Sequence, residues 1–167
     1  ETEMNLFAAV AALAATRLDR PVKLRPDRDQ DMIATGKRHD FVADYDVGFD
    51  AEGRIQAVDA RLAARCGFSA DLSGPVTDRA LFHADNGYFY PHVRLASRPL
   101  KTNTVSNTAF RGFGGPQGAV VAERIVEEIA FALGEDPLTI RQRNFYGPGQ
   151  DVTPYHQRVE DNILPRP

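Results

Sequence analysis

The chain has 167 residues, of which 43% are hydrophobic and 26% are charged, the balance of a globular protein with a buried core. Its net charge of -3 argues against a nucleic-acid-binding protein, because such proteins present a strongly basic face. No apolar run approaches the ~20 residues that cross a bilayer, so we expect no membrane segment. A single cysteine, Cys66, builds no disulfide framework, and we expect a small buried side chain in a cytoplasmic protein.

Both ends of the chain are unusual for a complete protein. The sequence begins at Glu1 without a methionine and ends on Leu-Pro-Arg-Pro, and neither a targeting peptide nor a repeat is visible. We therefore expect residues 1–167 to be a single piece of a longer polypeptide. The clear apolar period ends near Tyr146, so residues 147–167 are expected to be an irregular tail.

The first elements in chain order are helical. Apolar residues recur at helical spacing through the Ala-rich residues 2–16, which predicts a buried helix that Pro21 ends. Residues 22–25 are interpreted as a short strand. The charged residues 27–35 predict a helical turn that ends at Gly36.

A period of two begins at Phe41 and indicates a β-hairpin. Residues 41–49 alternate in polarity, residues 50–53 supply turn formers, and a second strand carries Val58, Ala60, Leu62 and Ala64 on one face. Ile55 and Ala57 lie out of phase with that set, which suggests a bulge at the start of the second strand. We expect an antiparallel hairpin with one face exposed to solvent.

The second half of the chain is expected to alternate extended and helical segments. Residues 69–75 are interpreted as a loop, Asp78 as the N-cap of a short helix over 79–83, and 93–104 as extended chain. Residues 119–133 predict an amphipathic helix that Gly134 caps, and Asp136 with Pro137 begins another. The expected fold is α+β, with antiparallel strands and helices packed on one side.

The most unusual stretch lies between the extended segment and the amphipathic helix. Residues 106–118 read SNTAFRGFGGPQG and contain four glycines within seven residues. Glycines permit close approach to a ligand, and the helix that follows offers free N–H groups to an anion. The loop lacks the endings of a phosphate-binding or dinucleotide-binding loop. From physics alone, a tight turn that packs a helix is favoured over a ligand site.

The block FRGFGGPQG, at residues 110–118, resembles a signature of the molybdenum hydroxylases, the family that includes xanthine dehydrogenases and aldehyde oxidases. The blocks DRDQDMIATGKRH at 27–39 and DRALFHAD at 78–85 resemble two further family blocks, and Lys-Thr-Asn at 101–103 leads into the loop as it does in the family. The resemblance covers essentially the whole chain, and it is stronger to the xanthine dehydrogenases. It implies that the chain is part of a larger molybdopterin-binding domain.

The resemblance also implies an activity and its cofactors. The family's molybdenum, held by molybdopterin, hydroxylates hypoxanthine and xanthine to urate in purine catabolism, and electrons leave through 2Fe-2S clusters, FAD and NAD on other parts of the enzyme. The implied partners are the purine, the rest of the molybdenum domain and the iron–sulfur and FAD parts, with neither nucleic acid nor membrane. Cys66 alone cannot ligate an iron–sulfur cluster.

Site roles follow from the resemblance residue by residue. Arg79 resembles the arginine that stabilises negative charge developing on the purine, and Glu1 resembles the glutamate that hydrogen-bonds the ring, so both are catalytic and substrate-binding candidates. Phe113 resembles the aromatic residue that stacks on the purine. Arg111, through its backbone N–H, resembles the residue that faces the molybdenum ligands, with Phe110 and Gly112 as further cofactor contacts.

Simpler interpretations stay open for these residues. Arg79 could be a surface arginine that pairs with Asp78 or Asp85, and Phe113 could be a core residue. The histidines, which are His39, His83, His92 and His156, have no spacing typical of metal ligands.

Several segments that complete the family's site lie outside this sequence, including the glutamate that acts as general base. We therefore expect the isolated chain to be inactive, to bind no cofactor and to expose apolar surface. The alternatives are part of an aldehyde- or N-heterocycle-oxidising relative and a non-catalytic module that keeps the fold.

Overall fold

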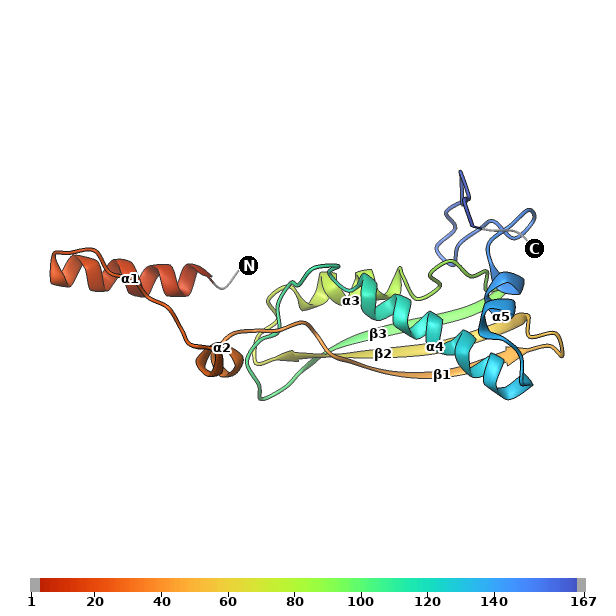
Figure 1. The fold of residues 1–167 in the computed structure, drawn as a ribbon, viewed down its shortest axis with the longest axis horizontal. Coiled ribbons are helices and arrows are strands. Elements are labelled where there is room, and N and C mark those ends of the chain that lie inside the picture. The colour runs from red at the N-terminus through yellow and green to blue at the C-terminus, as the bar shows by residue number, and fades with distance from the viewer. Residues whose placement is uncertain (1–3, 165–167) are drawn as a thin grey trace.

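The computed structural model describes residues 4–164 and contains one small sheet with helices on one face (Figure 1). The elements in chain order are α1 (Met4–Leu18), α2 (Arg28–Ala34), β1 (Phe41–Phe49), β2 (Ile55–Gly67), α3 (Ser73–Leu81), β3 (His92–Lys101), α4 (Gly115–Leu133) and α5 (Pro137–Asn144). The predicted α+β class is confirmed.

The sheet has the order β1-β2-β3, and its two pairings differ in direction. β1 and β2 form the predicted antiparallel hairpin. Gly48 pairs with Ala57 and Phe49 with Ile55, so Gln56 is an extra residue on β2, where the bulge was predicted. β3 pairs with β2 in parallel, so the expectation of an all-antiparallel sheet is wrong. Two successive strands can pair in parallel only through a crossover, and here the crossover contains α3.

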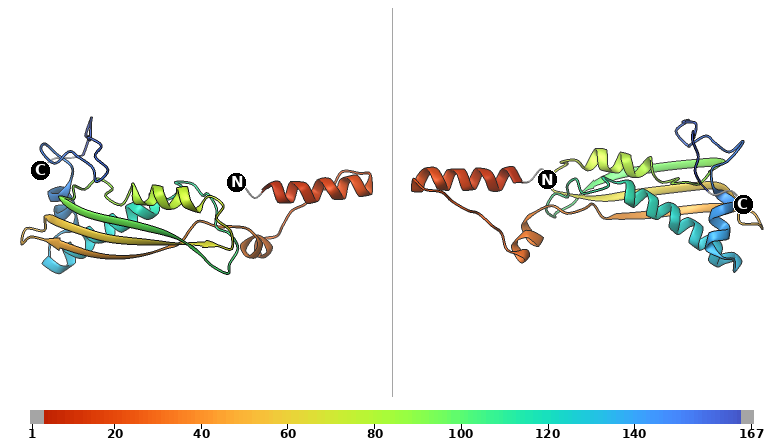
Figure 2. Two further views of the ribbon diagram at one scale, coloured as in Figure 1. Left: turned by 180° about the vertical axis from the view of Figure 1, so that it is seen from behind. Right: turned by 45° about the horizontal axis from the view of Figure 1, so that its top comes forward.

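The hydrophobic core lies between the sheet and the two helices α3 and α4. Figure 2 shows both helices on the same face, with the strands uncovered when the molecule is seen from behind. The predicted β2 residues Val58, Ala60, Leu62 and Ala64 are all buried. α4 contributes its own apolar stripe, which comprises Val121, Ala122, Ile125, Val126, Ile129 and Ala130. Cys66, at the end of β2, is also buried, as predicted.

Helix α3 begins at Ser73, six residues before the predicted start. Asp78 is therefore not its N-cap but an exposed residue of its second turn, and the expected loop over 69–75 is partly helical. Ser, Gly and Pro are turn formers, yet Pro75 is tolerated because it lies in the first turn, where its missing N–H has no helical acceptor. Burial of Val76, Thr77 and Ala80 against the rest of the core stabilises the helix.

The N-terminal segment differs most from the prediction. α1 forms as expected but contains no buried residue, and Leu6, Val10 and Leu13 are exposed. It extends away from the sheet at one end of the molecule (Figure 1). Residues 22–25 form no strand, although they lie in the described part of the chain. A strand needs a pairing partner and an amphipathic helix needs an apolar surface, and the described residues supply neither here.

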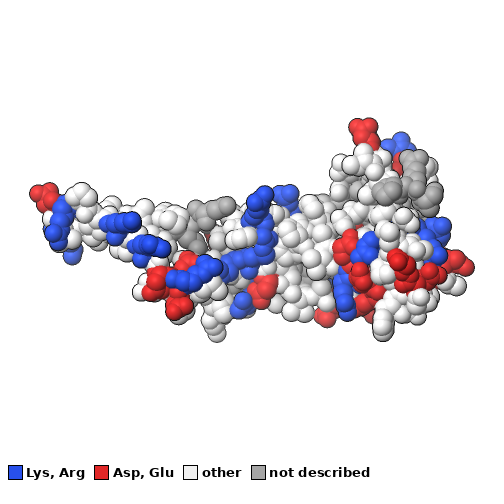
Figure 3. Space-filling view, viewed as in Figure 1, with Lys and Arg blue, Asp and Glu red and all other residues white. Residues whose placement is uncertain are grey.

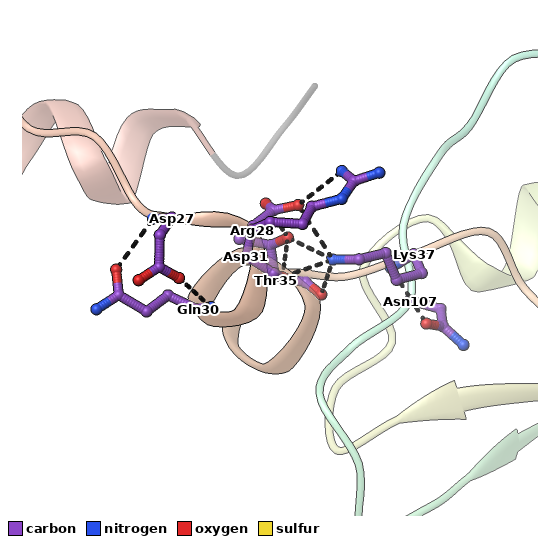
Figure 4. Close-up of polar contacts among 7 residues, drawn as sticks. All are labelled: Asp27, Arg28, Gln30, Asp31, Thr35, Lys37 and Asn107. Carbon is purple, nitrogen blue, oxygen red and sulfur yellow. Dashed lines mark hydrogen bonds and ion pairs between the residues drawn. The ribbon is translucent and has the colours of Figure 1, made fainter.

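Helix α2 is capped at its start and tied to the glycine-rich segment at its end. Asp27 and Gln30 form a capping box, and the Nζ of Lys37 donates to the Asp31 carbonyl oxygen at 2.7 Å (Figure 4). The Lys37 backbone N–H donates to the Oδ1 atom of Asn107 at 3.3 Å. These contacts attach residues 35–37 to the chain that leads into the loop.

Helix α5 starts at the predicted Asp136 cap and ends at a buried asparagine. The Oδ1 atom of Asn144 accepts from the Ile55 N–H at 2.8 Å, and its Nδ2 atom donates to the Gly53 oxygen at 2.8 Å. After α5, residues 147–164 form isolated bridges and neither a helix nor a named strand. None of the described helices combines the length and apolar character that crossing a bilayer requires.

Candidate functional site

Two candidate site segments leave the same edge of the sheet. Because β2 and β3 are parallel, both end at one edge, and α3 follows β2 while the glycine-rich loop follows β3. The two connections touch there, since the Phe68 N–H donates to the Thr104 oxygen at 3.0 Å. The Asn107 N–H also donates to the oxygen of Cys66, at the end of β2, at 2.9 Å. The carboxyl ends of parallel strands are where ligands bind in many α/β sheets.

The loop before α4 has an unusual backbone. Three successive residues have positive φ, namely 90° at Gly112, 50° at Phe113 and 98° at Gly114. A Cβ atom on Gly114 would lie 2.0 Å from the Val76 carbonyl oxygen, so only glycine allows this contact between the loop and α3. Phe113 is not a glycine and is held in a strained conformation, a feature that concentrates at functional sites.

The same backbone presents donors that the protein does not use. The Phe113 N–H donates to the Phe110 oxygen at 2.8 Å, and the Gly115 N–H to the Gly112 oxygen at 2.9 Å. Within residues 4–164, the N–H groups of Arg111, Gly112 and Gly114 donate to no protein acceptor. Free N–H groups at the start of a helix, where the helix dipole is positive, favour an anionic ligand.

Arg79 lies beside this loop. Its Nε atom is 3.8 Å from the position that a Cβ on Gly115 would occupy, and its side chain is exposed. Within the described chain it forms no ion pair with Asp78 or Asp85, and the Asp85 carboxylate accepts instead from the Tyr146 hydroxyl. The interpretation of Arg79 as a paired surface arginine therefore finds no support in the structure.

The other predicted site residues differ in how far they are buried. Phe113 is half-buried and lies outside the hydrophobic core cluster. Phe110 is 55% exposed, and its ring lies under the guanidinium of Arg38. Arg111 and Gly112 are exposed on the loop. Glu1 lies outside the described residues.

The structure adds two side chains that sequence reasoning missed. Arg38 donates from Nη2 to the Arg111 oxygen at 2.6 Å, and Gln117 donates from Nε2 to the His39 oxygen at 3.0 Å. The second polar atoms of these side chains, Arg38 Nη1 and Gln117 Oε1, are buried without a partner in the described chain. Both residues lie within blocks that carry the family resemblance, but no local pattern indicates that they contact the loop.

Burial lowers the pKa of His39, next to Arg38, below its usual value, so its imidazole is neutral near pH 7. Its Nε2 atom is 2.8 Å from the Ser73 hydroxyl, which connects residues 37–39 to the start of α3. His39 is therefore a structural contact between segments.

These residues fit an anionic organic cofactor better than a directly bound metal. No group of three or more His, Cys, Asp or Glu side chains that could hold a metal is present between residues 4 and 164. The unused N–H groups are donors that an anionic group would satisfy. On the face drawn in Figure 3, Lys and Arg side chains form a band between α2 and α3.

Comparison with known proteins is consistent with this fit. Residues 2–145 match the model of the molybdopterin cofactor-binding domain. The chain belongs to this family. The molybdopterin-binding match covers all of the elements from β1 to α5 and the whole of the glycine-rich loop.

The curated relatives are longer enzymes. The chain is 48% identical over 166 residues to the xanthine dehydrogenase of Dictyostelium discoideum and 47% identical over 164 residues to xanthine dehydrogenase 1 of Arabidopsis thaliana. Each match covers 98% or more of this chain and spans 12% of the relative. The chain therefore aligns with one segment of these longer xanthine dehydrogenases.

Solved structures show the same arrangement. The aldehyde oxidoreductase of Desulfovibrio gigas aligns with a TM-score of 0.82 at 32% identity, over 94% of this chain and 17% of that chain. The quinoline 2-oxidoreductase of Pseudomonas putida 86 aligns with a TM-score of 0.72 at 23% identity, over 89% of this chain and 20% of that chain, which supports the fold alone. The fold and the family resemblance stated from the sequence are both confirmed.

Proposed function

We propose that this chain supplies substrate- and cofactor-contacting loops to a xanthine dehydrogenase that oxidises hypoxanthine and xanthine. The observation that supports the proposal is the position of the Arg79 side chain beside a loop with three unused backbone N–H groups. Arg79 offers an exposed positive charge, and the loop beside it offers backbone N–H donors. A purine and an anionic cofactor need both kinds of contact.

Each residue has a distinct task in this proposal. The molybdenum cofactor, when bound, supplies the two-electron oxidation chemistry. The N–H groups of Arg111 and Gly112 hold its electron-rich atoms, with Phe110 nearby. Phe113 stacks on the purine plane, and its half-buried ring lies outside the hydrophobic core cluster. Arg79 stabilises negative charge as it develops on the purine, and Glu1 hydrogen-bonds the ring.

A purine is favoured over an aldehyde for two reasons. The identity to xanthine dehydrogenases is 43–48% for eight curated relatives, against 32% for the aldehyde oxidoreductase structure. The guanidinium of Arg79 also has a role only where charge spreads over a ring and its exocyclic oxygen. An aldehyde- or N-heterocycle-oxidising relative is the second candidate, because the D. gigas enzyme shares the fold.

The remaining cofactors and partners belong to other parts of the protein. We propose that 2Fe-2S clusters, FAD and NAD are bound by segments outside these 167 residues, because the chain spans 12% of its relatives. The rest of the molybdenum domain then covers the exposed face of α1, and this chain alone neither binds the cofactor nor catalyses. The single buried thiol of Cys66 favours a reducing compartment such as the cytoplasm.

The test is Arg79→Met in the full-length protein, with Arg98→Met as the control. Arg98 is an exposed arginine on β3, and it lies outside the candidate site. We expect Arg79→Met to slow xanthine oxidation about a hundredfold or more and to leave aldehyde oxidation within about threefold, because only the purine needs the guanidinium. Equal losses on both substrates would contradict the proposal, and a full-length protein that purifies without molybdenum would favour a non-catalytic module.

A further inference from the structure

Residues 37–39 are fixed to the loop from several sides. The Thr108 N–H donates to the Lys37 oxygen at 3.1 Å, and the Lys37 N–H donates back to the side chain of Asn107. Two residues further on, the His39 oxygen accepts from Gln117 of α4. The backbone of Arg38 is therefore held between the start of the loop and the helix that follows it.

From this fixed position, the Arg38 side chain contacts two successive loop residues. Its Nη2 atom donates to the Arg111 carbonyl oxygen at 2.6 Å, and its Cζ atom lies 4.4 Å from the centre of the Phe110 ring. Arginine suits both contacts, because a planar guanidinium can stack on an aromatic ring while its edge donates hydrogen bonds. Arg38 is half-buried, although its bond to the Arg111 oxygen is exposed to solvent.

The bond to Arg111 determines where the next N–H points. No peptide bond in the described chain is cis, so the carbonyl of Arg111 and the N–H of Gly112 point in opposite directions. A guanidinium that holds the carbonyl on one side therefore holds the Gly112 N–H on the other side. That N–H is one of the three donors that no protein acceptor uses.

The held peptide also precedes the strained part of the loop. Gly112, Phe113 and Gly114 follow it with positive φ, and a freely rotating peptide before them would let the turn relax. The Nη1 atom of Arg38 lies 3.9 Å from the position of a Gly112 Cβ and has no partner in the described chain. The guanidinium therefore lies against the same residue whose N–H it orients.

We propose that Arg38 is a positioning residue that fixes the Arg111–Gly112 peptide and thereby aims the Gly112 N–H at the group bound by the loop. This inference rests on the proposed function, since it assigns a second residue to the same site. Arg38 itself acts through the loop, and no contact with substrate is required of it.

The experiment uses the full-length protein with Arg38→Met and Arg38→Lys, and Arg65→Met as the matched control. Arg65 lies at the same end of the sheet, but its side chain pairs with the exposed Asp40 and not with the loop. The measurements are molybdenum content, kcat and KM for xanthine, thermal stability, and the electron paramagnetic resonance spectrum of the bound molybdenum.

We expect Arg38→Met to keep molybdenum and the stability of the control, to change the spectrum, and to lower kcat about tenfold, less than removal of a direct donor costs. KM should change less than kcat. Arg38→Lys keeps one charged donor without the planar fork, so its kcat should lie between those of the wild type and Arg38→Met.

Two results would overturn the inference. One is wild-type kcat and spectrum in Arg38→Met. The other is a loss of kcat that follows a loss of thermal stability and that Arg38→Lys does not rescue, because Arg38 would then only stabilise the fold. Failure of the proposed function is distinct, since it appears in the wild-type protein as absent molybdenum or absent xanthine oxidation.

Discussion

The crossing of α3 and α4 offers a stringent test of the structure, and Gly118 is the residue to change. A Cβ atom at this position would lie 2.1 Å from the Ala80 carbonyl oxygen and 2.9 Å from the His83 carbonyl carbon. Both neighbours are backbone atoms, so neither can move aside as a flexible side chain would. Gly118→Ala must therefore push the two helices apart.

The size of the stability loss in Gly118→Ala follows from these short distances. The contact with the Ala80 oxygen falls about 1.3 Å short of the 3.4 Å at which ordinary contacts begin. Overpacking of this kind typically costs ~1–3 kcal/mol, even after the ~1 kcal/mol by which alanine improves a helix interior. We therefore expect local unfolding of α3 and α4 to become about 5- to 150-fold more frequent.

Hydrogen exchange of the full-length protein is the assay, because it reports the stability of α3 and α4 separately from other domains. The control is Gly74→Ala in α3, where a Cβ meets nothing within 4 Å and a small stabilisation is expected. The proposed function also predicts that xanthine oxidation falls in Gly118→Ala, because α3 carries Arg79 next to Ala80. Equal exchange in Gly118→Ala and Gly74→Ala would refute the tight helix crossing.

Two further predictions concern buried polar groups. Asn144→Ala removes the partners of the Ile55 N–H and the Gly53 oxygen, so the end of the hairpin should lose about 2–4 kcal/mol of stability, measured by hydrogen exchange. The control, Asn86→Ala, removes one exposed bond to Glu123 and should cost less than about 1 kcal/mol. Equal losses of stability in the two variants would contradict the structural role of Asn144. Burial raises the pKa of Asp85 above its ordinary 3.8, so the folded state disfavours the ionised form and loses stability as pH rises from about 4 through that raised pKa. Asp85→Asn should therefore gain stability over the wild type as pH rises, measured as the difference between their denaturation midpoints. A difference that does not change with pH would contradict the raised pKa of Asp85.

The hairpin and α4 could be predicted because their patterns are local. The alternation of apolar and polar residues through β1 and β2 indicates one buried face of the sheet. The apolar stripe of α4 indicates the helix face that packs on the same core. The parallel pairing of β3 was missed because the first turn of α3, with Ser73, Gly74 and Pro75, resembles a loop. A full-length helix between two strands would have predicted a crossover and hence a parallel pair.

The candidate site was predictable in part. The glycines of the loop indicate close approach, and the family resemblance directed attention to Arg79 and Phe113. The contact of Arg38 with Arg111 could not be predicted, because 73 residues separate them and neither has a local pattern that identifies a partner. Such a contact exists only once the sheet has brought the two segments to one edge.

The mixed sheet has a consequence for the order of folding. The hairpin of β1 and β2 closes over a short turn, residues 50–54, whereas β2 and β3 pair only after residues 68–91 have been ordered between them. Loop closure costs entropy before the ladder forms, so pairings that are distant in sequence form slowly. Arg79 lies in the crossover between β2 and β3, and the glycine-rich loop follows β3, so both depend on this late pairing. A folding intermediate that contains only the hairpin would have a partly formed sheet without the candidate site. It would also expose the unpaired side of β2 to other chains.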